Sequence, residues 1–232
     1  MNAEANVAAE LVPGKKRRVR REPEAARTLI LDVTQRLMLD EGYAAVSTRR
    51  NAKEAGLAAA LVHYYFPTTD ELFIALHRRL TDRQLEELRI VLASENPIRS
   101  LWEFQTTWTH ASLGVEFMAL ANHRKAIREE IARRTESARD VQAELLEPFL
   151  NRSQSRPGSC NALSIATLLM GVARTLVNEE SIGIMRGHED VRALVEWVVN
   201  QVSPADAHPK PLPQAGGGKI RKRARAAAVR RR

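Results

Sequence analysis

Apolar residues recur every three or four positions along most of the chain, the spacing that one face of an α-helix requires. The first such series follows Pro23, a residue suited to the first turn of a helix, and predicts a helix over 23–40. Gly42 is expected to end this helix in the left-handed conformation. The series consists of Ala26, Ile30, Val33 and Leu37.

Two short helices are predicted next. Ser47 and Thr48 are suited to cap the start of the first one, which Gly56 ends. The second occupies about 58–65, because Pro67 cannot continue a helix.

A long helix follows, since Thr68 and Glu71 have the spacing of a capping box and apolar periodicity continues to about residue 92. The strand-type alternation of β-branched residues is absent. The sequence therefore predicts an all-α fold. Further helices are expected at about 98–111, 113–121, 124–150, 160–185 and 188–202.

The second short helix carries a run of aromatic residues. The stretch from 56 to 72 reads GLAAALVHYYFPTTDEL, with His63, Tyr64, Tyr65 and Phe66 in succession. Four consecutive positions point in different directions around a helix, so these side chains cannot all face a core. We expect Phe66 to turn inward and some of the others to face an external partner.

Two short helices joined at a glycine and flanked by longer ones form the helix-turn-helix arrangement. In DNA-binding proteins of this type the second helix lies in the major groove while the first crosses the phosphate backbone. The segment 27–78 also resembles the N-terminal domain of TetR-family (tetracycline-repressor family) transcriptional regulators. The matching pieces are EGY at 41–43, STR at 47–49, AKEAGL at 52–57, FP at 66–67 and DELF at 70–73.

The resemblance implies a ligand-responsive repressor that binds a palindromic operator in double-stranded DNA as a homodimer. It implies a three-helix DNA-binding domain over 23–80 and a helical domain for ligand binding and dimerisation over 81–203. The residues that it assigns to DNA contact are Ser47, Thr48, Arg49, Arg50, Ala58, Ala59, Ala60, His63, Tyr64, Tyr65, Thr68 and Thr69.

Side-chain chemistry supports these roles. A hydroxyl at a helix start can cap the helix and donate to a phosphate, and Arg49 offers a charged fork for a phosphate or a guanine edge. The small side chains of Ala58 to Ala60 allow a close approach to the groove, and outward aromatics with polar tips can position the helix on DNA.

The chain departs from the family pattern at four positions. Ala58 replaces a frequent serine that caps the recognition helix and contacts a phosphate, a loss of about 1 kcal/mol. Thr69 replaces a lysine and Arg50 an acid. Asn51 replaces an aliphatic residue, so its amide needs a partner in the core. We expect base readout to be sparse.

The last two helices carry apolar stripes. By resemblance they form a four-helix bundle with a second copy, which places a dimer interface within 160–202. Burial inside one domain explains the same stripes. The stripes comprise Ile165, Leu168, Val172 and Leu176 on one helix and Val191, Leu194, Val195, Val198 and Val202 on the other.

Aromatic and apolar bulk is concentrated between residues 98 and 121, where the family usually encloses a small effector. Such spacing fits a plain core as well as a cavity for an apolar or amphipathic molecule. The candidate ligand-binding residues are Trp102, Gln105, Trp108, Thr109, Phe117 and Met118, with Phe104 and His110 nearby.

The net charge of +8 lies at the two ends of the chain. Residues 204–232 hold nine Lys or Arg and one Asp, and residues 1–22 hold six Lys or Arg and three Glu, which leaves the region between them at −3. Both ends are expected to be disordered basic arms, which bind polyanions without reading sequence or simply aid solubility. A nucleoid-type protein that coats DNA through these arms is therefore the alternative to a specific regulator.

Other classes of function lack support in the sequence. Nucleophile-elbow, zinc-protease and phosphate-loop motifs are absent, so we expect no enzyme, no cofactor and no metal site. His188 with its two acidic neighbours is typical of a charged helix start, and Cys160 is the single cysteine, which favours a reducing cytoplasm. No run of 18 apolar residues is present to cross a membrane.

Overall fold

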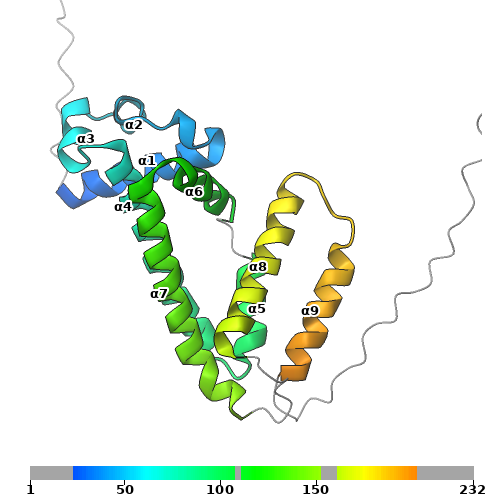
Figure 1. The fold of residues 1–232 in the computed structure, drawn as a ribbon. Helices are drawn as coiled ribbons and strands as arrows, with labels where there is room; N and C mark the ends of the chain where they lie inside the picture. Colours follow the sequence, from blue (N-terminus) through cyan, green and yellow to red (C-terminus); the bar gives the residue numbers. More distant parts are fainter. Residues whose placement is uncertain (1–22, 108–110, 153–160, 203–232) are drawn as a thin grey trace, which may run out of the picture.

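The computed structural model of the chain describes residues 23–107, 111–152 and 161–202 (Figure 1). It contains α-helices and one short 3-10 helix in these ranges and no strand, which confirms the all-α prediction. The two predicted arms, 1–22 and 204–232, lie outside the described residues, as do Trp108, Thr109, His110 and Cys160. The elements are α1 (Pro23–Glu41), η1 (Tyr43–Ala45), α2 (Thr48–Ala55), α3 (Ala59–Tyr65), α4 (Thr69–Leu92), α5 (Pro97–Thr107), α6 (Ala111–His123), α7 (Lys125–Leu150), α8 (Ala162–Ser181) and α9 (His188–Val202).

Most predicted helix ends lie within two residues of the observed ones, but two ends and the conformation of Gly42 were wrong. Helix α5 ends at Thr107 instead of 111, and residue 111 is the first of α6. Helix α8 ends at Ser181 instead of 185, because Gly183, with φ 84°, lies in a turn that interrupts the helical pattern. Gly42 has φ 81° and ψ 169°, so it is not in the left-handed helical conformation. It leads instead into η1, which the apolar pattern did not predict.

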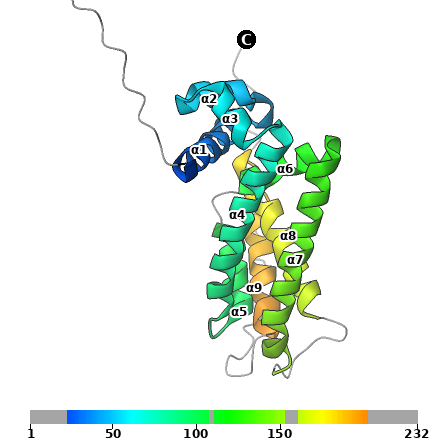
Figure 2. The same cartoon turned by 90° about the vertical axis from the view of Figure 1, so that its left-hand side faces the viewer.

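The helices form a head and a body (Figures 1 and 2). Helices α1, α2 and α3 gather at one end, and the long helices α4 and α7 run from there along the body beside α5, α8 and α9. Helix α6 packs on α1 and on η1, so it joins the head although it lies far along the sequence.

Two apolar clusters correspond to these parts. The head cluster contains Val62 and Phe66 from the α3 region together with Leu113, Phe117 and Ile127 from α6 and α7. The body cluster is built from α5, α8, α9 and the ends of α4 and α7. Helix α4 contributes to both clusters, so the domain boundary expected at residue 80 falls within a continuous helix.

The apolar stripes of α8 and α9 divide between core and surface. Ile165, Leu176 and Val195 are buried in the body cluster. Leu168 and Leu194 are half exposed, so the two stripes do not form one continuous outer face. None of the helices in the described ranges has the length and hydropathy needed to cross a bilayer.

Candidate nucleic-acid interface

Helix α2 begins and ends with the predicted signals. The Ser47 hydroxyl accepts a hydrogen bond of 3.2 Å from the Arg50 N–H and so caps the helix. Gly56, at φ 63° and ψ 33°, adopts the left-handed conformation after Ala55, which a residue with a side chain adopts at a cost. These two ends fix the angle at which α3 leaves α2.

Helix α3 is anchored on one face and open on the other. Val62 is fully buried and Phe66, just after the helix, is 3% exposed, so both hold α3 to the head cluster. The opposite face is open to solvent: Ala59, Ala60 and His63 are exposed, and Tyr64 is 77% exposed. A short helix with this division can enter a groove without losing its anchor.

The aromatic run therefore divides as its positions require. Tyr65 is half-buried against the head cluster, and its ring meets that of Tyr64 edge-on, with centroids 5.2 Å apart. Phe66 faces inward beneath the Arg27 guanidinium, 5.6 Å from the ring centroid. Tyr64 and His63 are the members of the run that present polar tips to solvent.

Arginine side chains of α2 differ in their availability. Arg50 pairs with Glu41 at 2.7 Å, which offsets its unfavourable position at the helix start and engages its guanidinium. Arg49 is exposed and has no ion-pair partner among the described residues. Lys53, one turn further on, is exposed in the same way. It was not among the predicted DNA contacts, although its i+4 spacing from Arg49 places both side chains on one face.

The start of α3 lacks a side-chain cap, as expected from Ala58, whose backbone is extended at φ −71° and ψ 138°. At the start of α4, by contrast, the capping box is complete. The Thr68 hydroxyl accepts from the Glu71 N–H at 3.1 Å, and the Glu71 carboxylate accepts from the Thr68 N–H at 3.3 Å. Thr68 is exposed and the adjacent Thr69 is half-buried.

Asn51 lies fully buried between α1 and α2, and its amide has the partner that the sequence required. Its Nδ2 donates to the Thr34 hydroxyl at 2.5 Å, and that hydroxyl donates to the Ile30 carbonyl at 2.7 Å. The Asn51 Oδ1 atom is buried without a partner. This chain of bonds holds α2 on α1.

A cavity of about 140 Å³ lies in the body between α4, α5, α6, α7 and α8. Three of the candidate ligand-binding residues, Gln105, Phe117 and Met118, line it. Trp102 does not: it is 4% exposed and packs in the body cluster, because its position on α5 faces the core. The remaining lining comes from α4, α7 and α8, which sequence patterns did not single out.

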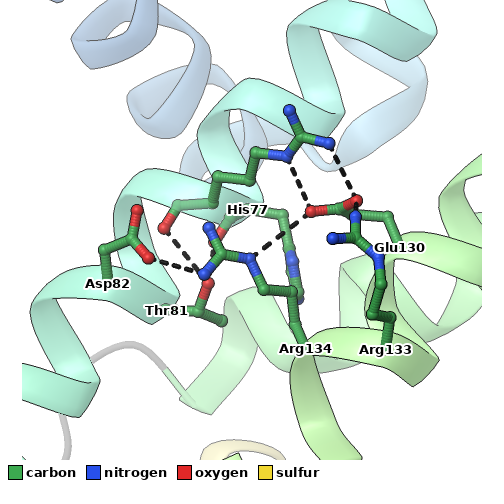
Figure 3. Close-up of polar contacts among 7 residues, drawn as sticks. His77, Thr81, Asp82, Glu130, Arg133 and Arg134 are labelled. Carbon is green, nitrogen blue, oxygen red and sulfur yellow. Dashed lines mark hydrogen bonds and ion pairs between the residues drawn. The ribbon is translucent and has the colours of Figure 1, made fainter. Parts of the chain in front are cut away.

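Polar residues connect this cavity to α4 (Figure 3). The buried carboxylate of Glu130 on α7 accepts two bonds from Arg78 on α4, at 2.7 and 3.0 Å. It also pairs with Arg133 and, at 3.4 Å, with Arg134. Arg134 in turn pairs with Asp82 on α4 at 2.6 Å, and it lines the cavity.

His77, also on the cavity wall, packs edge-on against Phe117 with ring centroids 4.9 Å apart. Burial, and next the charge of Arg134, lower the pKa of His77 to about 4. His77 is therefore neutral near pH 7. In the described ranges no group of three or more His, Cys, Asp or Glu side chains is placed to hold a metal ion.

Helix α2 is capped at its start, and α3 follows it with one face buried in the head cluster and the other exposed. This arrangement defines a helix-turn-helix protein of the DNA-binding class. Residues 30–76 match the sequence model of the tetR family of bacterial regulatory proteins. The matched residues run from α1 into α4 and include the whole helix-turn-helix, so this region is similar to the DNA-binding segment of tetR-family regulators.

The chain is also similar to individual proteins of known sequence or structure. The HTH-type transcriptional regulator PksA of Bacillus subtilis (strain 168) is 32% identical over 111 residues, which cover 44% of this chain and about half, 54%, of PksA. Among solved structures, reduced NemR of E. coli superposes with a TM-score of 0.65 at 17% identity, covering 78% of this chain and all of NemR. A transcriptional regulator of Saccharomonospora viridis in complex with choline gives 0.61 at 23% identity, covering 74% and 94%. These structural likenesses concern the fold.

Proposed function

We propose that the protein is a transcriptional repressor that acts in the cytoplasm, binds an operator in double-stranded DNA as a homodimer and responds to a small molecule. The exposed face of α3 carries this proposal, because Ala59, Ala60 and Tyr64 form a narrow, anchored surface that fits a major groove. Arg49 and Lys53 on α2 supply cations for the flanking phosphates.

A second copy is expected to cover the outer surface of α8 and α9. A groove of about 550 Å³ runs between these helices, with Leu168, Val172 and Val191 in its lining. Half of the large apolar side chains that are exposed in the described ranges lie on α8, on α9 or between them. Such a concentration favours burial against a partner, and twofold symmetry suits a helix-turn-helix protein. The exposed side chains concerned are Leu163, Leu168, Ile182, Ile184, Met185 and Leu194.

The cavity between α4 and α7 is the proposed effector site. Arg134 lines it and pairs with Asp82 on α4, and Glu130 pairs with Arg78 one turn earlier. A ligand in this cavity lies against α4, which contributes His77 to the lining and begins shortly after α3, so it can act on α4. Two such subunits would change the spacing of their recognition helices, a coupling that makes DNA and ligand binding mutually dependent.

DNA footprinting against an excess of random DNA tests the proposal. The wild-type chain should protect a small set of genomic sites with twofold symmetry. Arg49→Ala and Tyr64→Ala should each weaken binding to those sites by about tenfold or more, from the loss of 1–3 kcal/mol per contact. Arg89→Ala removes an exposed cation on α4 far from α3 and serves as the matched control. Equal affinity of all four proteins would contradict the assignment.

A DNA-coating protein is the second candidate, favoured by the basic residues at both ends of the sequence. Such a protein would lose its footprints in the same competition, because its affinity comes from counterion release. Removal of residues 204–232 should flatten the salt dependence of binding under either candidate if that arm contacts DNA. When the truncated and full chains are compared at the same salt concentration, a regulator should still protect its specific sites, whereas a coating protein should not.

A further inference from the structure

The cavity lining is unbalanced in charge. Three arginines contribute to it, Arg134, Arg139 and Arg174, while no Asp or Glu is among the lining residues. Arg134 already pairs with Asp82 and with Glu130. Arg139 and Arg174 form no ion pair in the described part of the chain, so the site carries uncompensated positive charge.

The same cavity gathers polar atoms that lack partners. Of four buried side-chain atoms without a hydrogen bond in the described ranges, three line it: Nδ1 of His77, Nε of Arg139 and Oε1 of Gln142. Gln142 is 4% exposed, so solvent does not satisfy it. Buried polar groups are almost always bonded in a native protein, and a cluster of exceptions within one cavity indicates a polar ligand.

The arginine atom identifies the chemistry of that ligand. An Nε–H group donates and cannot accept, and the guanidinium keeps its charge at any pH of interest. A carboxylate oxygen accepts a hydrogen bond from this N–H group and carries the opposite charge. The Gln142 amide can turn its nitrogen toward such an oxygen, and neutral His77 can donate through either ring nitrogen.

The rest of the lining is apolar, with Leu85, Leu88, Leu113, Phe117 and Met170 among its members. At about 140 Å³, the space is close to that of an engineered apolar cavity of about 150 Å³ that takes up benzene. A ligand that fills it is therefore compact, with an apolar body on the order of one aromatic ring.

We propose that the effector is a compact monocarboxylate with such an apolar body, held by its carboxylate on Arg139 in the field of Arg174. This inference rests on the proposed function for its regulatory meaning, and on the cavity for its chemistry. A cationic ligand is disfavoured, because it would enter a site of the same charge. The site is therefore unsuited to a cation such as choline, which is bound in the Saccharomonospora viridis structure.

Calorimetry with matched probes tests the inference. Benzoate, benzyl alcohol and benzylammonium share a ring and differ in charge, and hexanoate, hexanol and hexylammonium repeat the comparison with a linear body. Each is titrated into the full chain, without DNA, near pH 7. We expect at least one carboxylate to bind at least tenfold more tightly than its alcohol, and its ammonium counterpart to bind more weakly still.

Variants separate the charge contact from packing. Arg139→Met should reduce carboxylate affinity about tenfold or more and leave alcohol affinity unchanged, whereas Arg89→Met, on the outer surface of α4, should change neither. Circular dichroism of each variant checks that it folds. Binding of the ammonium probes as tight as that of the carboxylates overturns the inference, as does the absence of carboxylate binding at millimolar concentration or indifference to Arg139→Met.

The failure of this inference can be told from the failure of the proposed function. Operator footprints that persist while the carboxylates do not bind contradict the ligand class and leave the regulator intact. Carboxylate binding without any specific footprint would support the proposed ligand class and contradict the proposed regulatory function.

Discussion

The carboxylate of Glu116 accepts a hydrogen bond of 2.6 Å from the backbone N–H of Tyr43, 73 positions earlier in the chain. Tyr43 begins η1, the turn that leads from α1 into α2, and Glu116 lies on α6. The neighbouring residues Leu113 and Phe117 line the cavity. One helix thus contacts both the proposed effector site and the turn that sets the position of the DNA-binding helices.

Glu116→Ala should therefore destabilise the head. The substitution leaves the Tyr43 N–H without its charged acceptor, and such a loss costs about 1–3 kcal/mol. Glu116→Gln keeps an acceptor oxygen and should cost clearly less. Urea unfolding measures both differences. Glu136→Ala, at an exposed position of α7, is the control, and a loss in Glu116→Ala no larger than in this control would show that the bond contributes nothing.

Ala58→Ser should stabilise α3. Ala58 has the extended backbone of an N-cap residue, and a serine hydroxyl there can accept from the first-turn N–H groups, a gain of about 1 kcal/mol. Thermal unfolding of Ala58→Ser and of the control Ala59→Ser, one position inside the helix, tests this. A gain that is equal in both variants would point to a general effect of serine and not to capping.

The sequence predicted the features that depend on near neighbours. The cap at Ser47, the end of α2 at Gly56 and the capping box at Thr68 each involve atoms within four residues, so residue type and spacing determine them. The inward Phe66 follows from geometry as well, because four consecutive aromatics cannot share one face.

Features that depend on distant helices were not predictable in this way. The bond from Tyr43 to Glu116 and the pairing of Arg78 with Glu130 join elements whose relative placement no local pattern encodes. The position of Trp102 was not predictable either, since its spacing fits a cavity wall and a core equally well. Trp102 lies in the core because α5 packs on α8.

Acid should weaken the fold through His77. Its pKa is about 4 in the folded chain and about 6.5 when unfolded, so below pH 6.5 the unfolded state binds more protons. The stability that neutral His77 contributes is complete above pH 6.5 and is lost as the pH falls toward 4, by on the order of 3 kcal/mol. Urea unfolding of the wild type and of His77→Gln between pH 7 and 4.5 measures it. A difference in unfolding free energy between the two proteins that does not change with pH would contradict the prediction.

The junction of α8 and α9 should respond to pH in the opposite sense. The two ring nitrogens of His188 face two carboxylates: Nε2 lies 2.8 Å from Glu179 and Nδ1 lies 3.3 Å from Glu180. A neutral imidazole donates from one nitrogen, whereas an imidazolium donates from both. The bond to Glu179 and then that to Glu180 hold the pKa of His188 above its ordinary value, and Arg192, which pairs with Glu180 at 2.6 Å, completes the cluster.

The direction in which stability changes with pH follows from this raised pKa. The folded state holds the proton more tightly than the unfolded chain, so the stabilisation is complete below about pH 6.5 and is lost as the pH rises through the folded pKa. His188→Gln should remove it, so the difference in unfolding free energy between the wild type and this variant should shrink as the pH is raised from 6 to 9. His123→Gln, at an exposed position at the end of α6, is the control for replacing a histidine. A difference that stays constant with pH would mean that His188 acts through packing, and α9 would then be held to α8 without a titrating contact.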